Sequence, residues 1–571
     1  MKFRYQYYGG TTVEDSHAAQ AFQFAPDTLR PPTWFDGVLR RDGLTHLHFR
    51  EALSALHDVV VSDMRTRGRD RTAYRQWCEA NEQTLLARFM AGAGELKQRA
   101  EALGAELTSL RAQKSAVLKP FYAAQQKYFD WLYNANRDAW YVLDPVITVH
   151  PDRLLFEAFS QDESSYCAVS VSHDVFARIG GMACGTTNID YSASLYDEFQ
   201  KIRDYKETRF GVDPAGFSVS VGDDPALREE KIELPDSWLR GFMQVSSAMA
   251  LPATVLDLHP MDLHSICAVL RQHRERGGPR SIRFELSPNA TPRLVFEPWD
   301  IVLPTRRSQL LGATLTQPRT IRLWGRRRLL TLERLIGLAT RVRVHLLDSG
   351  MPSFWVVELG EVTVTLGLTG WSASDWSASA RFNLLAPRHA VSDAAKLQVA
   401  QDLQRHWQAT PGEIAARTGL PEADVRAALA SWLQAGRAVY DLPAARFAWR
   451  ELSRDPLMLE QLLLDSTEED AALKLVHAGS VKLMGIERDE SRLRIRGEVR
   501  QGRQSASPQL SLDADEQITD AHCTCNHYRQ NRLRRGPCSH MLALRLLAQP
   551  RLDALRLAAA ATAADKEGME S

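Results

Sequence analysis

The feature that most constrains this chain is a cluster of metal-binding residue types in the segment AHCTCNHYRQNRLRRGPCSH, residues 521–540. Cys523 and Cys525 stand two residues apart, and after twelve intervening residues Cys538 and His540 stand two apart again. Three thiolates and one imidazole form a ligand set typical of closed, tetrahedral zinc sites. The pattern therefore predicts a Zn²⁺ site in which the intervening loop folds back round the ion.

Two histidines beside the first cysteine pair, His522 and His527, leave the ligand set open, because either could replace one of the four residues. Cysteines packed in an ordinary core are a second alternative, but this polar, arginine-rich segment would make a poor core. A catalytic zinc needs an open coordination position and a general base, whereas the motif offers four ligands and no glutamate. We therefore expect a structural zinc site.

The length of 571 residues exceeds what one hydrophobic core supports, so several domains are expected. Lysine plus arginine and aspartate plus glutamate both number 70, which excludes a global field that would recruit nucleic acid or acidic lipid. The odd number of cysteines, seven, is typical of a reducing compartment. The start MKFRYQYYGG lacks a signal-peptide core, and no apolar run is long enough for a membrane span. We expect a cytoplasmic protein with no membrane association.

Residues 1–144 are expected to form an aromatic-rich arm and a helical, coiled-coil region. Apolar residues recur in the helical part at steps of three and four, which indicates a heptad seam. The break at Gly92, Ala93 and Gly94 would let two helices fold back as an antiparallel hairpin. An ordinary core-facing helix is the alternative. The seam consists of Leu96, Ala100, Leu103, Leu107, Leu110, Val117 and Phe121.

Residues 145–385 are expected to form a mixed α/β and antiparallel β region. In residues 362–368, valine and leucine alternate with threonine and glycine, which predicts an antiparallel strand with one solvent-facing side. A glycine-rich segment contains Cys184, but a nucleophilic cysteine also needs a histidine base and oxyanion donors. A lone cysteine in a turn is more often structural, so we expect no enzymatic activity.

Tryptophans in the same region have two interpretations. Trp324 precedes three arginines, and Trp371 and Trp376 follow further along the chain. Exposed aromatic rings beside arginines could stack nucleic-acid bases. Tryptophans that close the core of a β domain are more common, and we favour that interpretation.

Residues 386–454 resemble a winged helix-turn-helix. Thr410 to Glu413 reads as a capping box with proline at the first helical position, Gly419 makes a turn, and a second helix follows from Glu422. The second helix of this fold often reads DNA, but here its first turn carries Glu422 and Asp424, which phosphates repel. A role in protein contact or domain packing fits better.

Residues 471–550 begin with strand-like alternation from Leu473 to Val499 and end in a helix that Pro550 is expected to stop, with a disordered tail over residues 563–571. Arginines gather on one strand face and in the spacer between the two ligand pairs. These candidate partner-binding residues are Arg492, Arg494, Arg496, Arg529, Arg532, Arg534 and Arg535.

Strands, a Cys-x-Cys pair, a spacer, and a Cys-x-His pair that opens a hydrophobic helix together resemble the SWIM zinc finger, a family named from Swi/Snf-type ATPases and Mutator-type transposases. The resemblance implies that Cys523, Cys525, Cys538 and His540 are the ligands. For the whole chain, the segments GMPSFWVVELG and CGTTNIDYSASLYDEFQKIRDYKET are similar to bacterial SWIM-finger proteins associated with MoxR-type AAA+ ATPase and von Willebrand A-domain systems.

The expected fold class is therefore an α+β multidomain protein. We expect a non-enzymatic, zinc-containing adaptor with protein partners, a MoxR-type AAA+ ATPase among the candidates. The alternative is a DNA-binding protein that uses the arginines named above, whose affinity would fall steeply with salt. A small-molecule substrate is not expected.

Overall fold

The computed structural model describes most of the chain outside residues 63–144. The described residues are 12–15, 19–24, 33–62, 109, 145–188, 196, 199–205, 207–212, 236–274, 280–288, 290–312, 317–371, 374–377, 381–387, 390–452, 467–489, 492–501, 504–513 and 516–570. The chain divides into two compact units, one of Met1–Asp63 with Leu143–Ser571 and one of Met64–Val142. The expected coiled coil lies in the second unit, outside the described residues.

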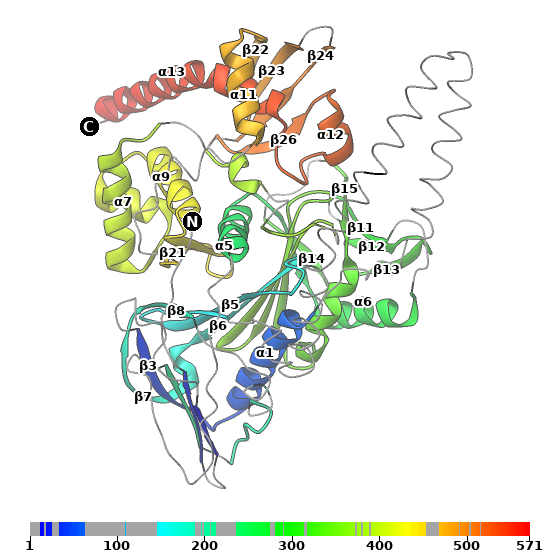
Figure 1. Cartoon of the computed structure of the whole chain (residues 1–571), viewed down its shortest axis with the longest axis vertical. Helices are drawn as coiled ribbons and strands as arrows, with labels where there is room; N and C mark the ends of the chain where they lie inside the picture. The colour runs from blue at the N-terminus through cyan, green and yellow to red at the C-terminus, as the bar shows by residue number, and fades with distance from the viewer. Residues whose placement is uncertain are drawn as a thin grey trace. The chain divides into compact units, whose positions relative to one another are not determined.

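The largest element in the described part of the chain is a nine-stranded sheet of order β14-β10-β16-β17-β18-β6-β5-β4-β8, antiparallel throughout (Figure 1). Helix α1 (Thr45–Val60) packs across β5, β6 and β18. In sheet order the strands are Gln309–Leu311, Thr254–Leu258, Arg341–Leu346, Ser353–Leu359, Val362–Leu368, Ser165–Ser172, Arg153–Phe159, Val146–Val149 and Gly185–Asn188.

The antiparallel expectation for residues 362–368 is confirmed, but the solvent-facing side is not. Nearly every residue of β18 is buried, and even Thr365 is only 5% exposed. The reason is tertiary: β18 lies in the middle of the sheet, and α1, from a distant part of the sequence, packs on it.

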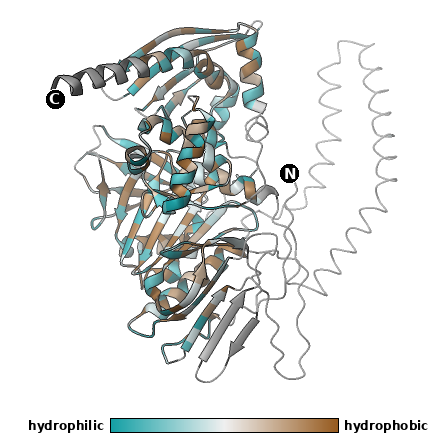
Figure 2. Cartoon of the chain, turned by 90° about the vertical axis from the view of Figure 1, so that its left-hand side faces the viewer, coloured by the Kyte–Doolittle hydropathy of each residue, from teal (hydrophilic) through white to brown (hydrophobic). Residues whose placement is uncertain are grey.

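A four-stranded sheet, a five-stranded sheet and several helices accompany the nine-stranded sheet. On β11 the apolar side chains of Ile282, Phe284 and Leu286 are buried, while Arg283 and Glu285 are partly exposed, as alternation requires. Figure 2 shows hydrophobic and hydrophilic residues interspersed along the strands and helices of the described part of the chain. The four-stranded sheet contains β13 (Ile301–Pro304), β12 (Arg293–Phe296), β11 (Ser281–Leu286) and β15 (Arg319–Trp324). The five-stranded sheet contains β1 (Thr12–Asp15), β2 (Ala19–Phe24), β9 (Glu207–Val212), β3 (Trp34–Leu39) and β7 (Phe176–Ala183). The helices are η1 (His173–Val175), α5 (Asp236–Met249), α6 (Pro260–Gln272), η2 (Arg326–Leu335) and η3 (Phe382–Leu385).

Residues 393–449 form three helices and a small antiparallel sheet of order β19-β21-β20. The capping box is confirmed: the Thr410 hydroxyl accepts from the Glu413 amide, and the Glu413 carboxylate accepts from the Thr410 amide. Gly419 ends the helix with a φ of 73°, a conformation that favours glycine. The elements are α7 (Asp393–His406), β19 (Gln408–Ala409), α8 (Pro411–Thr418), α9 (Glu422–Gln434), β20 (Ala438–Asp441) and β21 (Arg446–Trp449).

Residues 467–570, here called the C-terminal module, contain an antiparallel sheet in which β22, β23, β25 and β26 follow in order and β24 pairs with β23 (Figure 1). Helix α13 lies against β22, β23 and β25, and α11 packs on α13. The elements are α11 (Thr467–His477), β22 (Val481–Asp489), β23 (Arg492–Gln501), β24 (Gln504–Ala506), β25 (Gln509–Leu512), β26 (Ile518–His522), α12 (Asn526–Asn531) and α13 (Ser539–Glu570).

Two expectations for this module were wrong. Leu473 lies in a helix rather than a strand, because the acidic first turn of α11 suits a helix N-terminus and Ala472 and Leu475, three residues apart, face the core. Pro550 lies inside α13, whose backbone continues to Glu570 across the residues for which a disordered tail was expected. Proline removes one helical hydrogen bond, and the alanine-rich sequence that follows has high helix propensity.

The described residues thus form a mixed α+β protein with several antiparallel sheets. Among them, no helix combines the length and the apolar character needed to cross a bilayer.

Candidate metal centre

The four cysteine and histidine residues of the motif meet in the C-terminal module. The potential ligand atoms of Cys523, Cys525, Cys538 and His540 all lie within 4.8 Å of one another. The first pair follows the end of β26, and the second pair stands at the start of α13. The chain therefore brings the two pairs together as the sequence predicts, and the cluster could hold a metal ion.

Local hydrogen bonds fix the first pair. Cys525 is the N-cap of α12, and its Sγ accepts from the backbone amide of Tyr528 at 3.4 Å. The Tyr528 hydroxyl donates to the carbonyl of Ala521 at 2.6 Å, which ties α12 back to β26. A cysteine sulfur in place of the usual capping oxygen satisfies a free helix N–H while remaining available on its other side.

The second pair is held by the turn before it and the helix after it. Gly536 has a φ of 92°, and a Cβ there would lie 2.6 Å from the carbonyl oxygen of Arg381, so only glycine fits. The carbonyl of Cys538 accepts from the amides of Met541 and Leu542 at 3.0 and 3.1 Å, which starts α13. His540 then lies in the first turn of the helix.

The thiols perturb one another because they lie so close together. Hydrogen bonding from Cys538 lowers the pKa of Cys523 to about 4 and that of Cys525 to about 6. The same hydrogen bonds raise the pKa of Cys538, and the Cys523 sulfur raises the pKa of His540. These opposite directions have one cause, which is the close approach of the three sulfurs and the imidazole. A divalent cation binds such groups in their deprotonated forms.

Burial also suits a metal. Cys523 and Cys538 are almost fully buried, and Cys525 and His540 are half-buried. The Nδ1 atom of His540 is buried and has no hydrogen-bond partner in the described part of the chain. An unpaired buried polar atom is unfavourable, and coordination is one way to satisfy such a cluster. The donor set of three sulfurs and one nitrogen fits Zn²⁺.

The two flanking histidines lie outside this cluster. The side chain of His522 is exposed, and its ring packs edge-on against Tyr528 with centroids 5.3 Å apart. His527 is half-buried in α12, and its Nδ1 atom is buried without a hydrogen-bond partner among the described residues. Neither histidine is among the residues whose ligand atoms gather within 4.8 Å.

The spacer arginines differ in their environments. Arg529, Arg532 and Arg535 are exposed, and Arg532 lies over the Tyr528 ring at 5.2 Å. Arg534 is half-buried: its guanidinium carbon lies 5.0 Å from the centroid of the Trp371 ring, and its Nε donates to the carbonyl of Asn531 at 2.9 Å. Burial lowers the pKa of Arg534, and the charges of Arg535 and Arg532 add to this. Arg534 therefore has partners within the chain, unlike a fully solvated arginine.

The arginine face of β23 is compensated by acidic residues. Arg492 and Arg494 stand opposite Asp489 and Glu487 in the register of β22. Arg496 forms an ion pair with Glu487. Arg500, in the same row, pairs with Glu498 at 3.0 Å. The face is exposed, as the strand alternation predicted, but it carries both signs of charge.

The described part of the chain gives no sign of an activated cysteine outside the cluster. Burial raises the pKa of Cys184, and it raises the pKa of Cys267 to about 12. Burial also raises the pKa of Cys167. A raised pKa leaves these thiols protonated and weakly nucleophilic.

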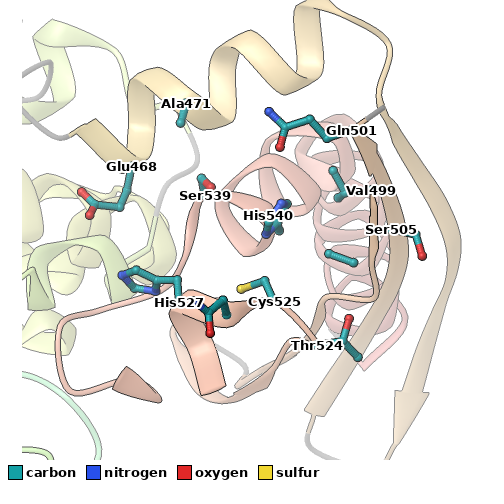
Figure 3. Close-up of a pocket in the computed structure, with 12 residues that line it drawn as sticks. Glu468, Ala471, Val499, Gln501, Ser505, Thr524, Cys525, His527, Ser539 and His540 are labelled. Atoms are coloured by element: carbon teal, nitrogen blue, oxygen red, sulfur yellow. The ribbon is translucent and has the colours of Figure 1, made fainter. Parts of the chain in front are cut away.

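Two features of this region could not be read from the sequence. One is the contact of Arg534 with Trp371, and the other is a cavity of about 590 Å³ that borders Cys525 and His540 (Figure 3). For the contact of Arg534 with Trp371, the signal in the sequence was the group of tryptophans that follows the GMPSFWVVELG segment.

No family model matches the chain, and no curated protein matches it. Among solved structures, 283 chains are similar. One is the Proliferating Cellular Nuclear Antigen of Entamoeba histolytica, with 11% sequence identity, a TM-score of 0.28, and coverage of 40% of this chain and 89% of that chain.

Proposed function

We propose that Cys523, Cys525, Cys538 and His540 bind one structural Zn²⁺ ion, and that the C-terminal module is a SWIM-type zinc finger. The observation that carries the proposal is the gathering of their four ligand atoms within 4.8 Å. When bound, the ion holds the end of β26, the start of α12 and the start of α13 together. Structural zinc of this kind contributes on the order of 10 kcal/mol of binding energy that is also folding energy.

The protein acts as a non-enzymatic adaptor in this proposal. Four ligands leave the ion no open position for a substrate or an activated water. The function of the chain is then to present surfaces to a macromolecular partner. The resemblance of the sequence to SWIM-finger proteins of MoxR-type systems makes an AAA+ ATPase our first candidate partner.

We assign residues 386–454 to a winged helix-turn-helix that contacts protein rather than DNA. The first turn of α9 carries Glu422 and Asp424. The nearby base, Arg426, forms an ion pair with Glu422 at 2.5 Å. A helix start of this charge suits a basic or neutral partner surface better than a phosphate backbone.

DNA binding is the second candidate, and one observation favours it. Arg529, Arg532 and Arg535 are each exposed, in α12 and in the residues that follow it. The mixed charges of the β23 face weigh against a larger phosphate-binding surface. Nucleic-acid binding would therefore rest on the spacer alone.

Two experiments test these assignments. Elemental analysis of the purified full-length chain should find one zinc per chain, and the Cys538→Ser variant should lose it. An anisotropy titration with random duplex and single-stranded DNA at two salt concentrations separates the adaptor from the DNA-binding protein. Absence of DNA binding at low salt excludes the DNA-binding function. Tight binding that weakens with salt would favour the DNA-binding function over the adaptor.

A further inference from the structure

The three sulfurs of the candidate metal centre differ in their access to solvent. Cys523 and Cys538 are 1% and 2% exposed, whereas Cys525 is only partly buried. Cys525 is also the one cysteine among the residues that line a cavity of about 590 Å³ in the C-terminal module (Figure 3). A molecule that enters this cavity therefore meets the Cys525 side chain, while the other two cysteines are covered by the rest of the chain.

The cavity is suited to water and to small polar molecules. Hydroxyl and amide groups contribute to its lining, from Gln501, Ser505, Thr524, Asn526 and Ser539. Polar cavities hold water, whereas apolar cavities of similar size stay dry, and each water occupies about 30 Å³ in the liquid. Hydrogen peroxide is little larger than water and carries the same kinds of donors and acceptors. It can therefore enter the cavity and reach Cys525.

Access decides which sulfur of the cluster reacts first. A thiol that coordinates a metal is deprotonated, so the three sulfurs are all thiolates in the zinc-bound protein. The thiolate is the form that oxidants attack, and among thiolates the exposed one is the most susceptible. The cysteines described outside the cluster are less reactive, because burial raises the pKa of Cys167, Cys184 and Cys267.

Cys538 is the sulfur best placed to react with an oxidised Cys525. The ligand atoms of the cluster all lie within 4.8 Å of one another, and Cys538 is hydrogen-bonded to Cys525. A disulfide between Cys523 and Cys525 would close a small ring through a single intervening residue, whereas one between Cys525 and Cys538 closes a loop of twelve residues. The longer loop leaves the backbone free to reach the specific geometry that a disulfide requires.

From these observations we propose that Cys525 is a redox modification site, at which a hydroperoxide that enters the cavity starts the oxidation of the zinc cluster. The Cys525 thiolate attacks one oxygen of hydrogen peroxide, the O–O bond breaks, and a sulfenic acid and a hydroxide form. The Cys538 thiolate then attacks the sulfenic sulfur, an S–S bond forms, and a second hydroxide leaves. Two thiolates have lost two electrons, one peroxide has been reduced, and two protons from solvent convert the hydroxides to water.

Oxidation releases the metal, because the disulfide removes two of the four ligands. The inference rests on the proposed structural zinc site and adds a means of regulation to it. In the reduced protein the ion holds β26, α12 and α13 together, and in the oxidised protein this junction is lost together with the surfaces that it supports. A thiol reductant reverses the disulfide by exchange, after which the site can bind zinc again.

The test uses the zinc-loaded full-length protein, hydrogen peroxide and a chromogenic zinc chelator, with release in the absence of peroxide as the baseline. A parallel sample contains dimedone, which labels sulfenic acids, and peptide mass spectrometry locates the label and the disulfide. We expect release of one zinc per chain, first labelling at Cys525, and a disulfide between Cys525 and Cys538 when dimedone is absent. Dithiothreitol and added zinc should restore the metal content. Retention of zinc under peroxide, or first labelling at Cys523 or Cys538, overturns the inference.

A variant of the reactive cysteine tests its role directly. Cys525→His keeps a side chain that zinc accepts and removes the exposed sulfur, so peroxide should release zinc at least about tenfold more slowly than from the wild type. Cys184→Ser is the control, because Cys184 is a partly exposed cysteine outside the cluster, and it should release zinc at the wild-type rate. Release from Cys525→His at the wild-type rate overturns the inference.

A matched pair of tryptophan variants tests the route through the cavity and leaves all four clustered residues in place. Gln501 is exposed and lines the cavity, so Gln501→Trp should narrow it and slow both the labelling of Cys525 and the release of zinc. Gln509→Trp changes an exposed glutamine of the same sheet that does not line the cavity, and it should behave as the wild type. Equal rates in the two variants overturn the inference.

Zinc content is measured in every sample before peroxide is added. A wild-type protein that contains one zinc and keeps it under peroxide contradicts only this inference. A wild-type protein without zinc contradicts the proposed function and the inference together.

Discussion

The guanidinium carbon of Arg534 lies 5.0 Å from the centroid of the Trp371 ring, which joins the spacer of the metal-binding motif to the segment after β18. The same side chain packs over Gly350, where an added Cβ would lie 2.6 Å from the Cδ atom of Arg534. Trp371 in turn packs against Trp324 with ring centroids 4.9 Å apart. The motif therefore has a contact with the central sheets as well as a metal cluster.

Arg534→Ala should loosen this contact without removing the metal. A cation–π contact of this exposure contributes about 1 kcal/mol, so we expect a loss of that size in the free energy of unfolding of the full-length protein. Hydrogen exchange should become faster in residues 348–351 and 369–371, and zinc content should stay at one per chain. Arg535→Ala, which changes an exposed neighbour, is the control and should alter none of these quantities. Unchanged exchange in Arg534→Ala would contradict the assigned role.

Arg450 and Glu157 form a buried ion pair between the end of β21 and the central sheet. Their side chains are 0% and 1% exposed, and the Nη1–Oε1 distance is 2.7 Å. The Tyr166 hydroxyl donates to the same carboxylate at 2.7 Å. Arg450→Met should destabilise the protein by about 3–5 kcal/mol, because it leaves a buried carboxylate without its cation.

The double variant Arg450→Met, Glu157→Leu separates lost charge pairing from lost packing. Because it removes both charges, we expect it to be less destabilised than Arg450→Met alone in urea unfolding. The Glu157→Leu single variant completes the comparison. If the losses in free energy of unfolding of the two single variants simply add up in the double variant, the two side chains do not interact, and the pairing is contradicted.

Acid should destabilise the central sheet through His345. Burial lowers the pKa of this β16 histidine to about 4, and the charge of Arg343 acts in the same direction. The unfolded chain therefore binds a proton near pH 6.5, whereas the folded protein binds one only near pH 4. The contribution of His345 to the free energy of unfolding is fully present above pH 6.5. It is lost as the pH is lowered toward 4, by about 3 kcal/mol in total.

His345→Leu should remove this part of the acid sensitivity. The free energy of unfolding, measured by urea titration between pH 7 and pH 4.5, should fall less steeply in the variant than in the wild type. Metal release at low pH affects both proteins equally and cancels in the comparison. Parallel pH profiles for the two proteins would show that His345 is not the titrating group.

Features set by neighbouring residues could be predicted from the sequence. The capping box at Thr410, the left-handed turn at Gly419 and the alternation of β11 depend on local geometry, and the structure contains all three. The meeting of the two ligand pairs was predictable for the same reason, since closing a loop of twelve residues costs little entropy compared with the energy of a metal site.

Features set by distant parts of the chain could not be predicted. Nearly every residue of β18 is buried because the strand lies in the middle of a large sheet on which α1 packs, and the sequence does not reveal that strand order. The charge of the β23 face depends on the register that places Glu487 and Asp489 opposite its arginines. The Arg450–Glu157 pair joins residues 293 positions apart, so no local pattern announces it.

Zinc content is the most direct test of the account. The metal content of the full-length protein should be measured by elemental mass spectrometry after purification without added chelator. The same measurement is made on the Cys523→Ser and Cys538→Ser variants and on a Cys184→Ser control. We predict one zinc per chain in the wild type and in Cys184→Ser, and none in the two cluster variants. His522→Ala and His527→Ala should also keep one zinc. A full zinc complement in Cys523→Ser or Cys538→Ser, or a wild-type protein that binds none, would contradict the proposal that these residues form a structural zinc site.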